Sequence, residues 1–198
     1  MHAVMPVLLP DVASFRKRNG GDQWDEMWEG VLHMCPMPTP DHQDLGRSTL
    51  IYVSLFWANP IRAKVFYEAN LASVGGWPKD YRIPDLLLLR HENFHVRKRK
   101  CFEGPVDGVV EFHSPGDEAY EKLEFYAKLG VGEVWIIHRD TKVPEIYLLK
   151  NGGYVKQRAT GGWVRSPLTG LEMKKGKPGK LAIRKIGDDA TRADLPEY

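Results

Sequence analysis

Gly108-Val109-Val110-Glu111-Phe112-His113-Ser114-Pro115 is a nearly continuous apolar run with one acidic residue inside it. Such a run predicts a strand, over residues 106–112, that is covered on both faces. The segment Pro84-Asp85-Leu86-Leu87-Leu88-Leu89 predicts a second strand of this kind, over residues 86–89, with an acid at its start. Because an unpaired carboxylate is costly in a buried strand, Glu111 calls for an explanation.

The arrangement of the two strands predicts that several charged side chains lie close together. If they pair antiparallel, Asp85 and Glu111 reach the same edge of the sheet, although the connecting segment is long enough to allow other pairings. Residues 117–129 have helical spacing, and Ser114-Pro115-Gly116-Asp117 offers that helix a cap, an early proline and an early acid. Lys122 then lies about two turns into a helix that begins at the same edge. The two carboxylates and the ammonium are therefore expected to converge.

The rest of the chain predicts a single α/β domain. Residues 24–34 predict two short strands that turn at Glu29-Gly30, and residues 41–58 predict a helix capped by Asp41 and ended by Asn59-Pro60. Further strands are expected at residues 65–67, 134–137 and 145–149, with a hairpin within residues 171–186. The core is expected at about 24–163, with residues 1–20 and 187–198 peripheral and the latter segment frayed.

Composition narrows the function classes. The chain has 198 residues, with 42% hydrophobic and 27% charged residues, as in an ordinary globular domain. Its net charge of +2 means that contact with a polyanion must come from local basic patches. Cys35 and Cys101 make no disulfide framework, so reduced thiols and a cytoplasmic location are expected. The N-terminus is a poor signal peptide, and no apolar run approaches the ~20 residues of a spanning helix, so no membrane association is expected.

Two carboxylates beside a lysine suit metal-assisted hydrolysis of phosphodiesters. Mg²⁺ (or Mn²⁺) is usually held by one or two carboxylates together with water and substrate phosphate. The metal polarises the phosphoryl oxygen and acidifies a water, and a lysine stabilises the charge of the transition state. Each residue also has an ordinary structural interpretation: Asp85 as a turn residue, Glu111 as a solvated strand end, and Lys122 as half of a surface pair with Glu121.

At these residues the chain resembles the Uma2 family (DUF820), a branch of the PD-(D/E)XK nuclease superfamily. The resemblance runs from about Trp24 to Trp163. It is carried in order by these segments: Glu26-Met27-Trp28-Glu29-Gly30, Pro40-Asp41-His42-Gln43, Pro84-Asp85-Leu86, Val110-Glu111-Phe112-His113-Ser114-Pro115, Glu121-Lys122-Leu123 with Tyr126, and Gly130-Val131 with Glu133-Val134-Trp135-Ile136-Ile137.

The resemblance implies a restriction-endonuclease-like core, with a mixed central β-sheet flanked by helices and an N-terminal β-hairpin. It also implies that Asp85 and Glu111 are metal ligands and that Lys122 is the catalytic lysine. The superfamily usually has that lysine two residues after the glutamate, where this chain has His113. Glu26 and His42 match further polar positions, with Glu26 as a third acid at the metal. His42 is either a contact to phosphate or water, or a cap or surface residue.

Two basic clusters are candidates for nucleic-acid contact. The first is Arg97, Lys98, Arg99 and Lys100, between the two acid-bearing strands. The second is Lys174, Lys175, Lys177, Lys180, Arg184 and Lys185. Contact with the phosphate backbone and a merely solvated loop remain equal alternatives for both.

The leading hypothesis is a Mg²⁺-dependent endonuclease, a hydrolase acting on the ester bonds of DNA. Three alternatives stay open: a nucleic-acid-binding module without cleavage, an assembly protein, and a different metal-dependent hydrolase, because a fold does not fix a function. A homodimer is compatible with a superfamily in which many nucleases cut as dimers. The sequence does not choose between DNA and RNA.

Overall fold

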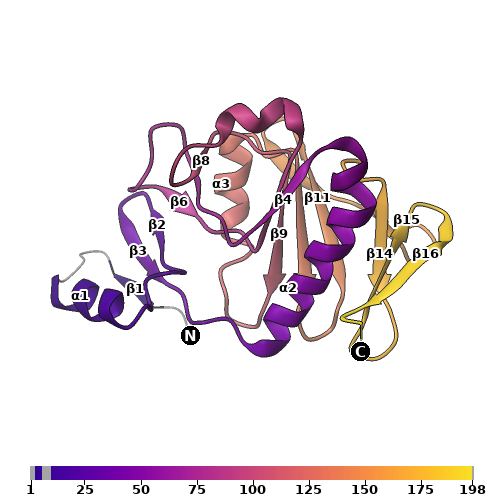
Figure 1. The fold of residues 1–198 in the computed structure, drawn as a ribbon, viewed down its shortest axis with the longest axis horizontal. Coiled ribbons are helices and arrows are strands. Elements are labelled where there is room, and N and C mark those ends of the chain that lie inside the picture. The colour runs from indigo at the N-terminus through magenta and orange to yellow at the C-terminus, as the bar shows by residue number, and fades with distance from the viewer. Residues whose placement is uncertain (1–2, 6–9, 198) are drawn as a thin grey trace.

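The centre of the molecule is a six-stranded mixed sheet, and the computed structural model describes it within residues 3–5 and 10–197 (Figure 1). Parts of the two segments predicted to be peripheral lie outside the described residues, namely residues 1–2, 6–9 and 198. Within this sheet, only β9 (Gly108–His113) and β10 (Glu133–His138) pair in parallel. The strand order is β12 (Gly153–Lys156), β11 (Pro144–Lys150), β10 (Glu133–His138), β9 (Gly108–His113), β7 (Leu86–Leu89) and β4 (Lys64–Tyr67).

Strands β7 and β9 form the predicted antiparallel pair. Leu86 lies opposite Val110, and Leu87 lies opposite Val109. One step further along this register, Asp85 and Glu111 reach the same edge of the sheet. All four leucines of β7 are fully buried, as the continuous apolar run predicted.

Alternation along the strands creates a core on each face of this sheet. Leu86 and Leu88 belong to one core, with residues of α2 (Pro40–Val53) and of the C-terminal sheet. Leu87 and Leu89 belong to the other core, with residues of α3 (Lys122–Leu129). Asp85, like Leu87, therefore lies on the α3 face of the sheet, because successive side chains of a strand point to opposite faces.

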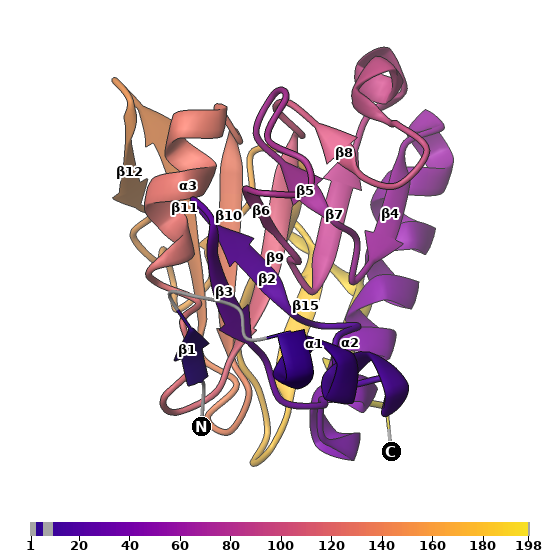
Figure 2. The ribbon, with the colours of Figure 1, turned by 90° about the vertical axis from the view of Figure 1, so that its left-hand side faces the viewer.

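An N-terminal sheet covers the α3 face. Figure 2 shows its strands β2 (Glu26–Trp28) and β3 (Val31–Met34) crossing in front of β9 and β10. The predicted hairpin is confirmed: β2 and β3 turn at Glu29 and Gly30, which have φ angles of 51° and 89°. Two positive φ angles are typical of the tight turns that match the twist of a hairpin. The strand order is β1 (Ala3–Met5), β3 (Val31–Met34), β2 (Glu26–Trp28), β6 (Tyr81–Arg82), β5 (Leu71–Ala72) and β8 (Phe102–Glu103).

Arg82 ties the N-terminal sheet to α3. Its guanidinium carbon lies 4.3 Å from the centroid of the Trp28 ring and 4.1 Å from that of Phe125. The guanidinium also donates to the carbonyl of Met27 at 3.0 Å. A buried arginine between two rings gains cation–π attraction on both sides, and this contact holds β2 close to α3.

A four-stranded C-terminal sheet completes the fold, in the order β13 (Val164–Arg165), β14 (Leu171–Lys175), β15 (Leu181–Lys185) and β16 (Asp188–Leu195). The predicted hairpin within residues 171–186 is confirmed. The expectation that residues 187–198 are frayed is wrong over β16. Leu195 is buried there, and the Tyr52 hydroxyl donates to the Thr191 carbonyl at 2.6 Å.

Two members of the second basic cluster have structural contacts in this sheet. The ammonium of Lys174 and the guanidinium of Arg184 lie 4.5 Å and 4.1 Å from the centroid of the Trp163 ring. Arg184 also forms an ion pair with the fully buried Glu172 at 2.6 Å. These two cations therefore stabilise the C-terminal sheet.

The helix boundaries differ from the predicted ones. Helix α2 is capped by Thr39, whose hydroxyl accepts from the His42 N–H, and not by Asp41, because Pro40 occupies the first helical position. The helical path continues past α2 as a π-helix (Ser54–Ala58) and a 3-10 turn (Asn59–Ile61), and a second 3-10 helix spans His91–Val96.

Helix α3 begins five residues later than residue 117, at Lys122. The preceding residues form turns instead, because the Asp117 carboxylate accepts from the backbone N–H groups of Ser114 and Ala119. Lys122 is thus the first helical residue and does not lie two turns into the helix. A short helix α1 (Pro10–Arg18) precedes the hairpin. Among the described residues no helix is both long and apolar enough to cross a lipid bilayer.

Candidate active site

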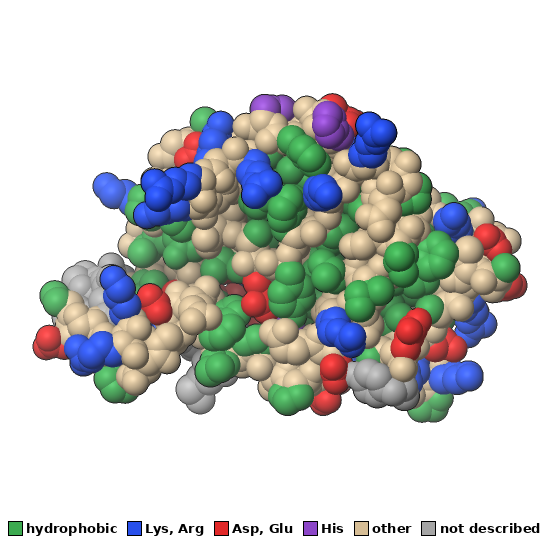
Figure 3. Space-filling view, viewed as in Figure 1, with side chains coloured by type: hydrophobic (Ala, Val, Ile, Leu, Met, Phe, Trp, Pro, Cys, Tyr) green, Lys and Arg blue, Asp and Glu red, His purple; other side chains and the backbone are tan. Residues whose placement is uncertain are grey.

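A pocket of about 310 Å³ lies where the central sheet, the N-terminal sheet and the start of α2 meet. In Figure 3 a hollow separates the part of the molecule that carries α1 from the main body, and acidic side chains are visible inside it. All five residues predicted for the site line the pocket: Glu26, His42, Asp85, Glu111 and Lys122.

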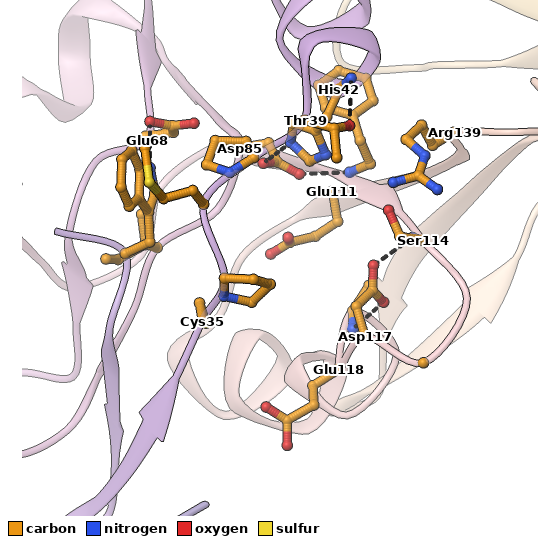
Figure 4. A pocket seen from close by; sticks show the side chains of 18 of the residues that line it. Cys35, Thr39, His42, Glu68, Asp85, Glu111, Ser114, Asp117, Glu118 and Arg139 are labelled. Atoms are coloured by element: carbon orange, nitrogen blue, oxygen red, sulfur yellow. Dashed lines mark hydrogen bonds and ion pairs between the residues drawn. The ribbon is translucent and has the colours of Figure 1, made fainter. Parts of the chain in front are cut away.

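Asp85 is held by two hydrogen bonds (Figure 4). Its Oδ2 accepts from the backbone N–H of Phe112 at 2.6 Å, and its Oδ1 lies 2.8 Å from Nε2 of His42. Since Phe112 directly follows Glu111, the first bond fixes the Asp85 carboxylate beside the second acid. Burial lowers the pKa of His42, but the hydrogen bond to Asp85 and the negative charges of Asp85, Glu68 and Glu111 together outweigh burial and leave that pKa raised.

Glu111 is deeply buried, and only 5% of its side chain is exposed. The Tyr126 hydroxyl donates to its Oε1, and the Lys122 ammonium donates to its Oε2 at 3.3 Å. Burial raises the pKa of Glu111 to about 8 against the opposing charge of Lys122, and the nearby Asp85 and Glu26 add repulsion. This carboxyl is therefore placed where a bound cation would displace a proton.

Lys122 bridges the two sheets that face each other across the pocket. Its Nζ lies 2.8 Å from Oε1 of Glu26 in β2 and 3.3 Å from Oε2 of Glu111 in β9. Burial alone would lower the pKa of Lys122, but Glu111 and Glu26 outweigh it and hold that pKa well above its ordinary value. The side chain is therefore a permanent ammonium fixed between two acids.

Glu26 has a full set of hydrogen-bond donors around it. Its Oε1 accepts from the Ile83 N–H at 2.8 Å as well as from Lys122, and its Oε2 accepts from the Trp28 indole at 2.7 Å. These contacts lock its rotamer. The arrangement suits a residue that positions Lys122.

The donor set of the pocket can be tested against the ion that the sequence predicts. Asp85 and Glu111 offer hard carboxylate oxygens, and each oxygen keeps a lone pair beyond its present hydrogen bond. Within residues 3–5 and 10–197 no group of three or more His, Cys, Asp or Glu is arranged to hold a metal by itself. A pair of carboxylates fits an ion such as Mg²⁺, which takes its other ligands from water and substrate.

The family model that matches the sequence is Uma2, described as "Putative restriction endonuclease", over residues 11–175. The chain belongs to the Uma2 family. A crystal structure from Anabaena variabilis ATCC 29413, described as a "putative nuclease belonging to DUF820", shares the fold with a TM-score of 0.58. It is 16% identical, and the match covers 72% of this chain and 81% of that one. No curated protein matches the sequence. The predicted family and the predicted fold class are confirmed.

In this Uma2 chain His113 stands where the wider superfamily usually has its lysine, and it does not line the pocket. Its Nδ1 lies 2.6 Å from Oδ1 of Asp117, and its ring centroid lies 4.9 Å from that of His138. Lys122 reaches Glu111 from α3 instead. The structure thus brings a lysine to the acids by a different route from the superfamily pattern.

Some pocket residues of the Uma2 chain were missed by the sequence analysis. The carboxylate of Glu68 accepts from the Trp24 indole at 2.8 Å and from the Gln43 amide at 3.1 Å. Glu68 directly follows β4, which is antiparallel to β7, so it reaches the same sheet edge as Asp85. The strand argument that placed Asp85 could therefore also have found Glu68. Arg139, Asp117 and Glu118 line the pocket from loops, and no periodic pattern marks them.

The segment of residues 97–100 lies apart from this site. All four side chains are exposed, and none of them lines the pocket. The Lys100 carbonyl accepts from the Asn70 amide at 3.2 Å, and the Arg97 guanidinium lies 5.8 Å from the centroid of the Phe66 ring. The structure therefore unites the five predicted pocket residues but leaves the predicted nucleic-acid contact separate from them.

Proposed function

We propose that this chain is a divalent-metal-dependent endonuclease that hydrolyses phosphodiester bonds of DNA. The family and fold are those of a restriction-endonuclease-like nuclease. The observation that carries the finer proposal is the convergence of Asp85, Glu111 and Lys122 in one pocket, with the side chains of the two acids 15% and 5% exposed.

Asp85 and Glu111 would hold Mg²⁺ or Mn²⁺, which when bound supplies Lewis acidity toward the phosphoryl group and a more acidic water. The other residues act on geometry and charge. His42 orients Asp85 through the bond to Oδ1, and Tyr126 orients Glu111. Lys122 keeps its proton and donates hydrogen bonds to the negative charge that develops on the phosphoryl oxygens, while Glu26 holds it in place.

Nucleophilic catalysis by a thiol is disfavoured in the same pocket. Cys35 lines it, but burial raises the pKa of this thiol to about 12. At neutral pH the sulfur is therefore protonated and a poor nucleophile. Attack by water is the reaction that the residues support.

The test is a cleavage assay on plasmid and on circular single-stranded DNA with Mg²⁺, with Mn²⁺ and with EDTA. We expect cleavage of at least one of the two substrates with either ion, and of neither with EDTA. Glu111→Gln keeps the size of the side chain but removes its charge, so activity should fall by more than about 10³-fold. The matched control is Glu124→Gln, which changes an acid of α3 that is 77% exposed and should leave the rate unchanged.

Thermal unfolding must show that Glu111→Gln is folded. Equal cleavage by this variant would trace the activity to a contaminating nuclease and refute the proposal. DNA binding without cleavage at any metal concentration would instead identify a binding module on the same fold.

A further inference from the structure

The proposed function leaves the form of the nucleic acid open, and the depth of the pocket limits it. The carboxylates that would act on the scissile phosphate lie in side chains that are at most 15% exposed. A phosphate reaches them only by entering a pocket of about 310 Å³. This volume is at the lower end of the roughly 300–1,000 Å³ of pockets that enclose small molecules, so it admits about one nucleotide.

One wall of the pocket is apolar. It includes Pro36-Met37-Pro38 and Trp24, and 70% of Met37 is exposed although it lines the same pocket as the buried acids. The Trp24 ring is fixed because its indole N–H donates to Glu68 at 2.8 Å. A flexible thioether and a fixed indole in the lining of one pocket suit contact with a flat base of any sequence.

The opposite wall carries a cation. In Figure 4 Arg139 and Glu68 lie on opposite sides of Asp85 and Glu111. The Arg139 side chain is 23% exposed, and its Nε donates to Asp140 at 2.8 Å. A planar guanidinium at the rim suits contact with one phosphate of a strand that enters beside it.

The remaining charge around the pocket opposes a second strand. Against the permanent cations Lys122 and Arg139, the lining includes six carboxyl side chains: Glu26, Glu68, Asp85, Glu111, Asp117 and Glu118. A continuous duplex carries two phosphate backbones, and its bases are stacked and unavailable to a side wall. The basic segment of residues 97–100, which would offset this repulsion, does not line the pocket.

We propose that the pocket takes a nucleotide of an unpaired strand, in single-stranded DNA or in an unpaired segment of a duplex, with its base against Met37 and Trp24. Continuous duplex is excluded by the depth of the acids and by the excess of acidic over basic side chains in the pocket lining. This inference rests on the proposed function, because it takes the pocket to be a nuclease site. It concerns only whether the bound nucleic acid is paired or unpaired.

A binding assay tests this inference independently of hydrolysis. The Glu111→Gln chain with Mg²⁺ is titrated, at one fixed salt concentration, against a fluorescent single strand, the same strand in a duplex, and that duplex with a central unpaired bubble. We expect the single strand and the bubble to bind at least about tenfold more tightly than the duplex. Equal or tighter binding of the duplex would overturn the inference.

The apolar wall is tested with exposed side chains, whose replacement does not disturb the core. Met37→Ala should weaken binding of the single strand about fivefold and leave duplex binding unchanged, and Met37→Phe should restore or strengthen it. The matched control is Leu55→Ala, which removes an apolar side chain that is 57% exposed and does not line this pocket. The same affinity for Met37→Ala and Leu55→Ala would overturn the assigned role of the wall.

Cleavage by the native chain then distinguishes the two proposals. Preference for the single strand in binding, with no cleavage by any metal-loaded sample, would refute the endonuclease and leave the inference standing. Cleavage of the duplex as fast as the single strand would refute the inference and leave the endonuclease standing. We expect cuts in the bubble substrate only at its unpaired nucleotides.

Discussion

The pocket residues and the basic segment of residues 97–100 are both rich in charge, but the structure holds them in opposite ways. In the pocket the side chains of Glu26, Glu111 and Lys122 are 2%, 5% and 11% exposed, and each carboxylate has a named hydrogen-bond donor. In the basic segment all four side chains are exposed. Water and salt screen the exposed charges, whereas the buried ones act at nearly full strength on each other.

The difference shows which charges can carry chemistry. Hydrolysis of a phosphodiester needs groups fixed within a fraction of an ångström, which requires locked rotamers. Attraction of a polyanion needs only the sum of charges nearby. We therefore expect substitutions in the pocket to lower the rate of the chemical step strongly. Substitutions in the basic segment should change the association of the protein with nucleic acid only weakly.

After Glu111→Gln, the largest effect in this comparison should come from Lys122→Met, which keeps the length of the side chain and removes its charge. Loss of the ammonium should lower kcat by about 10²–10³-fold, because one preorganised donor is lost, and should change KM little. It should also destabilise the protein by roughly 3–5 kcal/mol, since Glu26 and Glu111 lose the cation between them. Single-turnover cleavage and urea unfolding measure the two effects.

The control for that substitution is Lys128→Met, which changes a lysine of the same helix that is 65% exposed. It should leave both measurements within error. A folded Lys122→Met chain with normal kcat would reduce Lys122 to a structural ion pair.

A smaller effect should follow from His42→Ala, which frees Oδ1 of Asp85. The imidazole orients this carboxylate at 2.8 Å, and loss of such an orienting partner typically weakens metal affinity by about 10–100-fold. Titration of cleavage with Mg²⁺ should show a shifted midpoint and recovery at high Mg²⁺. His95→Ala, at an exposed histidine, is the control. Failure of Mg²⁺ to restore the rate would assign His42 to the chemical step.

Strand periodicity explains why the two acids were predictable. Continuous apolar runs identified β7 and β9, and in an antiparallel pair the start of one strand meets the end of the other. The same logic covers Glu68 at the end of β4. Tertiary neighbours of these acids were not predictable in this way: the Tyr126 hydroxyl reaches Glu111 only because α3 packs at one particular angle.

Local competition between side chain and backbone explains the misplaced helix starts. Asp117 has the composition of an early helical acid, but its carboxylate bonds to the N–H groups of Ser114 and Ala119 and stabilises a turn. Thr39 caps α2 although Asp41 is also a good capping residue, because Pro40 fixes the first helical position. The sequence also could not predict that residues 97–100 lie outside the pocket, because no periodic pattern determines the direction of a loop.

The pH dependence of stability tests how deeply Glu111 is buried, and its expected effect is of intermediate size. The pKa of Glu111 is raised from 4.5 to about 8, mainly by burial, so between these values the folded chain holds a proton that the unfolded chain releases. The contribution of Glu111 to stability is therefore present below about pH 4.5 and is lost as the pH rises through about 8. In EDTA, the Tm of the native chain should fall between about pH 4.5 and 8 by more than the Tm of Glu111→Gln does. The additional fall should be about 2–4 °C for each ~1 kcal/mol of unfolding free energy lost. Parallel Tm curves for the two chains would show that Glu111 is ionised throughout.

The smallest effect should come from replacing all four residues 97–100 with alanine. If the segment contacts phosphates only in encounter, its loss should reduce the slope of log affinity against log salt by about 0.7–0.9 for each contact removed, with kcat unchanged. A double alanine substitution at the exposed Lys150 and Arg158 removes two cations that belong to neither basic cluster and should not change that slope. A lower kcat at saturating DNA would bring residues 97–100 into the site. The difference between fixed and screened charge would then fail as an explanation, because an exposed segment would be acting on the chemical step.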